Sequence, residues 1–501
     1  MSLLEIIVLL PLLAALAIGL GAPARITALV SSGGVLFFSL LVALRFDRAL
    51  EGTAQFVSSR SLWDLPGIPK LSLAFGVDGI SLVLLLLAAL VLLAAILVAP
   101  AEDSLKGRAR LYYISLLLIG GGAIGAFLST DLFFLYAFHE LALIPTFLMI
   151  GIFGHGEDRV RVAWTITIYL GVGSLILLVG LLLAVIGLGG QTFDIAELIA
   201  LAKNPATGLS ASTQTWVYGL LLVGFGTLVS LFPFHSWAAP AYAAAPAPVA
   251  MLHAGVLKKF GLYGLIRIAL PMLPLGAAKW QTVLLVLLLG NILYLGFVTL
   301  AQKKLDRMAG TSSVMHMGYI FLGIAAGNVI GISGAVLLMV GHGLSIALMF
   351  GMAGWIRERC GTLEFSKLGG LAQAYPRLGL LFGFAVFASA GLPGFANFAG
   401  EVAVFFGAFA GEETNWTWIR WTTVGALWGV VISAVYLLRA YREIFFGPLA
   451  AGKGEGHDLN WAERIPLLLL IGALLLFGFI PEVLNQFIRP AVEGLFLTTA
   501  G

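Results

Sequence analysis

The chain has 501 residues, of which 60% are hydrophobic and 11% are charged. Soluble proteins carry about 25% charged residues, so this composition excludes an ordinary soluble enzyme and indicates an integral protein of the lipid bilayer. The net charge of +3 is too small to indicate nucleic-acid binding. The single cysteine, Cys360, excludes a disulfide framework and cysteine-ligated iron–sulfur or zinc sites within the chain.

Apolar runs bounded by charges, glycine or proline predict an all-α polytopic fold with about fourteen transmembrane helices of ~20 residues each. In chain order, the first seven runs are residues 3–20, 27–44, 80–98, 111–128, 132–153, 162–188 and 215–232. The second seven are residues 248–270, 281–300, 312–326, 331–355, 378–409, 422–446 and 465–480. The first run lacks a basic segment before it, so we expect a retained helix rather than a cleaved signal peptide.

Lysine and arginine predict the orientation of the chain in the membrane. They are enriched in loops that follow odd-numbered helices, for example at Lys106, Arg108, Lys303 and Arg439. Because basic loops tend to remain in the cytoplasm, both termini are expected on the non-cytoplasmic side of the membrane. The tail from residue 481 onward is expected to be amphipathic and to lie on the same side.

Two of the predicted spans contain helix-breaking residues. The seventh ends in Phe232-Pro233-Phe234-His235, and the twelfth contains Gly391-Leu392-Pro393-Gly394. A simple kink is one interpretation, because proline removes a backbone hydrogen bond. The other is a transport site, since interrupted helices in corresponding positions of two repeats mark such sites. The breaks lie five helices apart, which predicts inverted five-helix repeats formed by helices 4–8 and 9–13.

Four ionisable residues lie deep inside predicted spans: Glu140 in the fifth, Lys258 and Lys259 in the eighth, and Glu401 in the twelfth. Charges at such depth are costly and usually functional. Ion pairs that lock helices together are the alternative, but buried pairs often fail to offset their own desolvation. We therefore interpret the four residues as a proton relay. Adjacent lysines point about 100° apart on a helix, so at most one can face Glu140 squarely.

Histidines in apolar stretches extend this candidate relay, because imidazole both takes up and releases protons near neutral pH. His316 and His342, in the tenth and eleventh spans, are the principal candidates. His253 on the eighth span and His235 at the break of the seventh are further candidates. A packing role is at least as good an interpretation for His253, His316 or His342 taken singly, and a capping role is an alternative for His235. His139 points off the face of its neighbour Glu140 and is expected only to tune it.

Several motifs together resemble the antiporter-like subunits of respiratory complex I. The motifs are Phe75-Gly76-Val77-Asp78-Gly79-Ile80-Ser81, His139-Glu140-Leu141-Ala142-Leu143-Ile144-Pro145, Ser312-Ser313-Val314-Met315-His316-Met317-Gly318, Gly341-His342-Gly343-Leu344-Ser345 and residues 388–401. The resemblance implies fourteen core helices, inverted repeats with a half-channel in each, and breaks in helices seven and twelve. It also implies that Glu140, Lys259, His316, His342 and Glu401 form a proton-transfer axis.

Within that family, the chain is most similar to the M-type subunit of NADH–quinone oxidoreductase. It ends soon after helix fourteen, without the lateral helix of L-type subunits, and it carries Glu401 where N-type relatives usually have lysine. The expected domains are residues 1–110 with helices 1–3, 111–270 and 271–448 with the two repeats, and 449–501 with helix fourteen and the tail.

The sequence departs from the family pattern around helices six to eight. Leu228 occupies the position of the helix-seven lysine that is the expected partner of Glu140, and Thr165 replaces a common helix-six lysine. The family's Trp-Leu-Pro-Asp-Ala-His stretch is Trp237-Ala238-Ala239-Pro240-Ala241-Tyr242, and Lys258 is an additional charge. Either Lys258 supplies the missing ammonium, or the N-terminal half-channel has decayed. We favour the first hypothesis because Glu140 is retained.

The expected function is proton translocation by a redox-inactive membrane-arm subunit, driven by quinone reduction in partner chains. The resemblance implies L-type and N-type antiporter-like subunits as partners. It also implies that NADH, FMN, iron–sulfur clusters and quinone bind to other subunits, with no cofactor or metal in this chain. The alternatives are a subunit of a multisubunit Na⁺/H⁺ antiporter or membrane-bound hydrogenase, and a scaffold subunit with a degenerate N-terminal half-channel.

Overall fold

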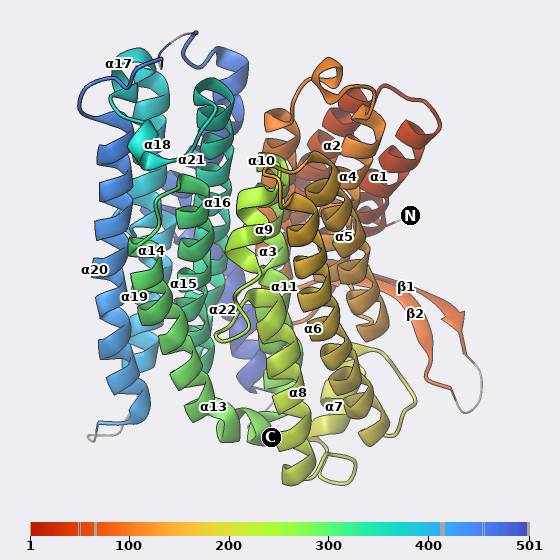
Figure 1. Ribbon diagram of the computed structural model, residues 1–501. Helices are drawn as coiled ribbons and strands as arrows, with labels where there is room; N and C mark the ends of the chain where they lie inside the picture. Colours follow the sequence, from red (N-terminus) through yellow and green to blue (C-terminus); the bar gives the residue numbers. More distant parts are fainter. Residues whose placement is uncertain are drawn as a thin grey trace.

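The computed structural model describes residues 2–48, 50, 52–64, 68–410, 416–452, 454 and 456–497. The predicted all-α membrane fold is confirmed: in this described part of the chain, ten helices are long and apolar enough to cross a membrane. Figure 1 shows most helices running side by side, with α20 at one edge of the bundle and α1 and α2 at the other. We call the end that carries α17 the upper end and the end that carries α7 the lower end.

The first six predicted runs are helices with nearly the expected bounds. They are α1 (Leu3–Gly19), α2 (Ala24–Arg45), α3 (Gly79–Val98), α4 (Ala109–Leu128), α5 (Leu132–Phe153) and α6 (Arg159–Gly187), with a short helix, η1 (Glu102–Leu105), between α3 and α4. Asp78 begins α3 by accepting a hydrogen bond from the Ser81 backbone N–H at 2.8 Å. The same carboxylate pairs with Arg267 at 2.9 Å, which ties α3 to the eighth span.

The seventh and eighth spans are interrupted. The seventh consists of α8 (Ala211–Val229) and, after a turn with a cis Phe232–Pro233 bond, α9 (Ala238–Ala244). The eighth consists of α10 (Ala247–Leu252), η2 (His253–Leu257), α11 (Lys259–Gly264), η3 (Leu265–Ala269) and α12 (Leu270–Met272), in which η2 and η3 are π-helical turns. The predicted break of the seventh span is confirmed.

The second half contains the remaining predicted spans. They are α13 (Pro274–Leu289) with η4 (Gly290–Tyr294) and α14 (Leu295–Leu300), then α15 (Leu305–Ala325), α16 (Val329–Cys360), α18 (Pro376–Ser389), α19 (Ala396–Phe409), α20 (Trp418–Phe445) and α21 (Trp461–Phe479). The short η5 (Phe365–Lys367) and α17 (Leu371–Ala374) join α16 to α18. The twelfth span is broken between α18 and α19, as predicted. Whether the two halves are inverted repeats remains a prediction.

A hairpin and two further helices also lie outside the predicted spans. A hairpin of β1 (Gln55–Trp63) and antiparallel β2 (Leu71–Val77) fills the loop between α2 and α3. It is fixed to α1 by the ion pair of Arg60 with Glu5 at 3.1 Å. The short α7 (Ile195–Lys203) and the C-terminal α22 (Glu482–Leu497) are the other two. The backbone of α22 lies so close to Gly79 that a Cβ there would meet the Phe487 carbonyl oxygen at 1.8 Å.

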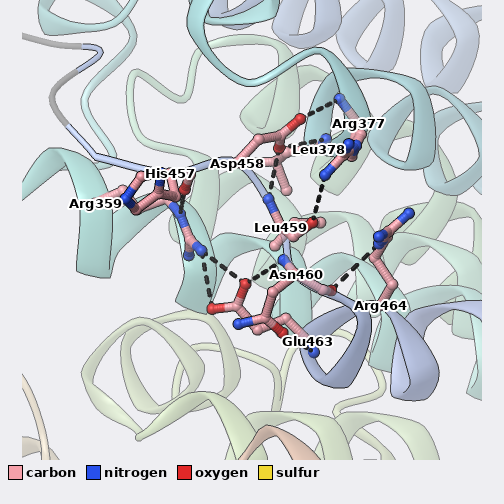
Figure 2. Close-up of polar contacts among 9 residues, drawn as sticks. All are labelled: Arg359, Arg377, Leu378, His457, Asp458, Leu459, Asn460, Glu463 and Arg464. Carbon is pink, nitrogen blue, oxygen red and sulfur yellow. Dashed lines mark hydrogen bonds and ion pairs between the residues drawn. The ribbon is translucent and has the colours of Figure 1, made fainter.

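A polar cluster fixes the start of α21 at the upper end (Figure 2). The Asp458 carboxylate accepts the backbone N–H groups of Arg377 at 2.7 Å and Leu378 at 3.3 Å, at the first turn of α18. Arg359, near the end of α16, pairs with Glu463 at 2.9 Å. The cluster therefore joins α16, α18 and α21 on one side of the bundle.

The eighth and eleventh spans form the centre of the bundle. The apolar windows of Ala247–Met272 and of α16 are completely buried, whereas those of α5 and α6 are less than half buried. Figure 1 shows α9–α11, α3 and α16 between the two outer groups of helices. Lys258, Lys259 and His342 lie on the two central spans, where neighbouring helices can exclude lipid from their polar atoms.

Candidate functional site

The two lysines follow the first π turn of the eighth span and are almost fully buried. Lys259 donates to the Ala254 carbonyl at 2.7 Å, and its Nζ lies 2.9 Å from Nδ1 of His342. Lys258 instead donates to the Ser313 hydroxyl at 3.4 Å, and its Nζ lies 5.5 Å from the centre of the Tyr242 ring. The two adjacent lysines therefore contact different helices, and neither of these contacts is with Glu140.

His342 and His316 continue the line of polar groups from Lys259. Their ring centres are 5.7 Å apart. His316 Nδ1 lies 2.8 Å from the Ser312 carbonyl oxygen, and Nε2 lies 3.1 Å from that of Ser389. Ser389 is the last residue of α18, where helix carbonyls lack an intrahelical partner. His316 thus links α15 directly to the break of the twelfth span.

Glu401 lies on the far side of that break, on α19, and is only 5% exposed. Its carboxylate packs against the backbone of Gly391, where a Cβ would lie 2.5 Å from Oε2. Gly391 has φ +68°, a left-handed conformation that side chains oppose. Glu401 has no ion-pair partner among the described residues. The glycine therefore permits both the sharp turn and the close approach of the carboxylate.

Glu140 lies at the other side of the molecule and is less enclosed, with 33% of its side chain exposed. The Ser174 hydroxyl on α6 donates to its carboxylate, and the same hydroxyl lies 3.1 Å from the hydroxyl of Tyr136. The Nδ1 atom of His139 is 3.5 Å from Oε1 of Glu140. Ser174 and Tyr136 were missed in the sequence because isolated hydroxyls in membrane helices carry no distinctive pattern.

The structure does not bring Lys258 to Glu140. Within the described ranges, no lysine forms an ion pair with Glu140, and Leu228 is buried on α8. An aromatic stack lies on the route toward Lys259, since the His139 ring lies parallel to that of Phe260 with centres 4.0 Å apart. In this conformation the hypothesis that Lys258 supplies the missing ammonium is not fulfilled, because its side chain extends toward α15 instead.

His253 and His235 lie near the axis without closing it. Nδ1 of His253 is 3.3 Å from the Tyr242 hydroxyl, and its Nε2 has no hydrogen-bond partner in the described structure. His235 stacks on Phe232 at 5.4 Å in the break of the seventh span. Helix α9 begins without a side-chain cap, so the alternative of a helix-capping His235 is wrong for α9.

A cavity of about 1160 Å³ connects the upper surface with this region. Its lining includes the α3–α4 loop, His155, Arg357 and Tyr242, and Tyr242 contacts both His253 and Lys258. At its rim, burial, with help from Arg357 and Arg159, lowers the pKa of His155 to about 4. No sequence signal indicated this cavity, because it forms between segments that are distant in the chain.

The described residues contain no group of three or more His, Cys, Asp or Glu side chains placed to hold a metal ion. The arrangement instead consists of single titratable groups spaced across the centre of the bundle. Hydrogen bonds or short gaps separate Lys259, His342 and His316, while Glu401 and Glu140 lie at the two ends. Such an arrangement can hold and pass protons.

These features define a polytopic membrane protein of the antiporter-like class. The family model described as NADH:quinone oxidoreductase/Mrp antiporter, TM, matches residues 129–427, more than half of the chain. The chain belongs to this family.

Individual relatives agree with that membership. NADH-quinone oxidoreductase subunit M of Rhodobacter capsulatus is 34% identical over 99% of this chain and 96% of its own. NAD(P)H-quinone oxidoreductase chain 4 2 of Microcystis aeruginosa is 39% identical over 75% of this chain and 66% of its own. A chain of respiratory complex I from Thermus thermophilus with bound NADH aligns with TM-score 0.87 and 31% identity over 99% of this chain and 100% of that one. The predicted resemblance to M-type subunits is confirmed.

Proposed function

We propose that this chain is a redox-inactive membrane-arm subunit of a quinone-reducing complex and that it translocates protons. The observation that carries the proposal is the contact of Lys259 with His342, followed by His316 at the break of the twelfth span. Buried ionisable groups in membrane helices rarely serve stability alone. A sequence of them that ends at a helix break is suited to proton transfer.

Protons would enter through the cavity at the upper end and reach Tyr242, His253 and Lys258. From there the route continues along the eighth and eleventh spans. Lys259 and His342 exchange a proton across 2.9 Å, and His316 relays it toward Glu401. Glu401 would release it on the opposite side of the membrane. Because Gly391 has no side chain, the backbone at the break could move without a clash between that residue and Glu401.

The proposal includes partners and location. The names of the relatives support a place in an NADH–quinone oxidoreductase. We propose that the chain lies in the membrane arm of such a complex, beside L-type and N-type subunits, in a bacterial inner membrane. NADH, FMN, iron–sulfur clusters and quinone would then bind to other chains and supply the energy. Both termini would lie on the non-cytoplasmic side, as the distribution of basic loops predicts.

A subunit of a multisubunit cation/proton antiporter is the second candidate, because the family includes the Mrp antiporters. The two functions use the same internal axis but differ in what drives it. In the first, proton movement depends on electron transfer to quinone; in the second, it depends on a cation gradient. Membrane vesicles that pump protons on NADH oxidation, without added sodium, would favour the first.

Lys259→Met is the direct test, because it removes the ammonium and keeps an unbranched side chain that is only one atom shorter. Lys279→Met is the matched control, since Lys279 is exposed on α13. We expect Lys259→Met complexes to oxidise NADH with fewer protons pumped per electron, and Lys279→Met complexes to match the parent. Equal proton-to-electron ratios in both variants would contradict the proposal.

Lys258→Met separates the two hypotheses for the N-terminal half. If Lys258 approaches Glu140 in another conformation, its loss should reduce pumping as much as Glu140→Gln does. An unchanged ratio in Glu140→Gln membranes would instead mean that this half has decayed and the chain mainly completes the membrane arm.

A further inference from the structure

Glu140 lacks the helix-seven lysine that the family pattern leads one to expect. Position 228 is leucine, and Lys258 and Lys259 make contacts with other helices, to Ser313 of α15 and His342 of α16. A carboxylate at this depth needs a cation or a proton, because its charge is poorly solvated in a membrane. A partner must therefore come from somewhere other than these lysines.

His139 has the position and the unsatisfied atom to act as that partner. Its side chain is 3% exposed, and Nδ1 lies 3.5 Å from Oε1 of Glu140. In the part of the chain that is described, this nitrogen has no hydrogen-bond partner. We propose that His139 replaces the missing lysine at position 228 as the cationic, proton-exchanging partner of Glu140. This inference rests on the proposed function and specifies which residue pairs with Glu140 in the N-terminal half of the chain.

Packing holds the imidazole at that place. The ring lies on Phe260 with a 4.0 Å centre distance and an 18° interplanar angle, and Phe260 in turn meets Phe225 of α8 at 5.8 Å. Because the stack fixes the plane of the ring, rotation of the side chain is restricted. Phe260 also follows Lys259 directly in the chain, so a movement of the eighth span is transmitted to His139.

Position 228, where the family pattern has lysine, lies near the level of Glu140 in the bundle. Thr227 packs against Gly173 of α6, where a Cβ would lie 2.7 Å from its methyl group. The next residue of α6, Ser174, donates to Glu140. Position 228 is therefore one residue from a contact that adjoins Ser174, the hydrogen-bond donor to Glu140, and Leu228→Lys tests whether an ammonium placed there reaches the carboxylate.

The remaining titratable groups around His139 are few. Tyr136 and Glu140 lie on its own helix. The eighth span carries His253, Lys258, Lys259, Tyr263 and Arg267, of which Arg267 is paired with Asp78. Three neighbouring stretches contain no titratable residue: 115–128 of α4, 171–187 of α6 and 219–229 of α8. No acid other than Glu140 therefore competes for the imidazole from those segments.

The exchange is balanced in atoms and charge. When the Nδ1 proton moves to Oε1, one N–H bond breaks and one O–H bond forms. Imidazolium and carboxylate become imidazole and carboxylic acid, and the net charge of the pair does not change. Glu140 can thus be protonated without an unpaired charge forming in the membrane. In the family pattern, a lysine on helix seven would have this role.

His139→Phe tests the proposal because phenylalanine keeps the stack on Phe260 and removes the exchangeable proton. We expect a proton-to-electron ratio as low as that of Glu140→Gln in assembled complexes. His457→Phe, the same change at an exposed loop histidine, should leave the ratio unchanged. The decisive variant is His139→Phe combined with Leu228→Lys, in which the ratio should recover by at least half.

Three outcomes would overturn the inference. The first is normal pumping in His139→Phe, which would mean that a basic group of a neighbouring subunit serves Glu140. The second is loss of pumping without recovery by Leu228→Lys, which would mean that His139 only maintains the packing. The third is normal pumping in Glu140→Gln. If His139→Phe does not assemble, His139→Gln provides the same comparison. Failure of the proposed function is recognised separately, by normal pumping in Lys259→Met.

Discussion

Replacing Gly391 with alanine tests whether the placement of Glu401 at the helix break matters for pumping. A Cβ at this position would lie 2.5 Å from Oε2 and 3.1 Å from Cδ of Glu401. Ordinary carbon contacts are about 3.5–4.0 Å, so the carboxylate would have to withdraw by roughly 1 Å. The substitution thus displaces the terminal acid of the axis without removing it.

The backbone cost of the substitution can be measured independently. Gly391 has φ +68°, and alanine in the left-handed region costs roughly 1–2 kcal/mol. Gly361, at the end of α16, also has φ +68°, and a Cβ there would meet nothing within 4 Å. Gly361→Ala therefore carries the same strain without touching an ionisable group. The difference in proton pumping between the two variants therefore reports the effect of displacing Glu401.

A displacement of about 1 Å can slow a step that depends on positioned groups by roughly 100-fold. We expect Gly391→Ala complexes to assemble and to transfer electrons to quinone while pumping fewer protons per electron. Gly361→Ala complexes should pump as the parent does. The assay measures NADH oxidation and acidification in the same vesicles. Equal ratios in the two variants would refute a role for the position of Glu401.

Two further predictions concern the upper end. Asp306→Asn should lower the stability of the assembled protein by about 1–3 kcal/mol, because Arg357 would lose a carboxylate at 2.5 Å in a mostly buried pair. Glu364→Gln, at an exposed pair, is the control, and an equal fall in unfolding temperature would contradict the expectation. For His155, the lowered pKa of about 4 means that folding favours the neutral ring. The contribution of His155 to the free energy of unfolding is therefore present above about pH 6.5 and is lost as the pH falls toward 4. His155→Gln should flatten the curve of stability against pH between these values. An unchanged slope would exclude the assignment.

The transmembrane helices were predictable because one physical requirement determines them. A span must be apolar over about 20 residues, and that pattern is local in sequence. The hairpin of β1 and β2 was not predicted, since β1 is largely exposed and its register is interrupted between Gln55 and Ser58 and again between Ser61 and Trp63. Without a buried face, a strand shows little of the alternation from which it could be recognised.

The candidate site could be proposed from the sequence as a set of residues, but its contacts could not. Buried charges are conspicuous in any membrane helix, so Lys259, His342 and Glu401 could be selected from sequence alone. The partner of each lysine could not be predicted, because the π turn at His253–Leu257 inserts an extra residue before the two lysines. One inserted residue turns the rest of the helix by about 100°, enough to exchange one neighbouring helix for another.

The two halves of the axis therefore differ in kind. Lys259 contacts His342, and the rings of His342 and His316 have centres 5.7 Å apart. His316 in turn contacts the carbonyl oxygen of Ser389 at the end of α18. Between Glu140 and Lys259, the route crosses the face of Phe260. In the proposed mechanism, protons from the upper cavity would reach Lys258 by way of Tyr242 without passing Glu140. In the proposed mechanism Glu140 would act less as an entrance than as a charge whose state is sensed through His139, and its side chain, 33% exposed, would place that charge where a neighbouring subunit could influence it.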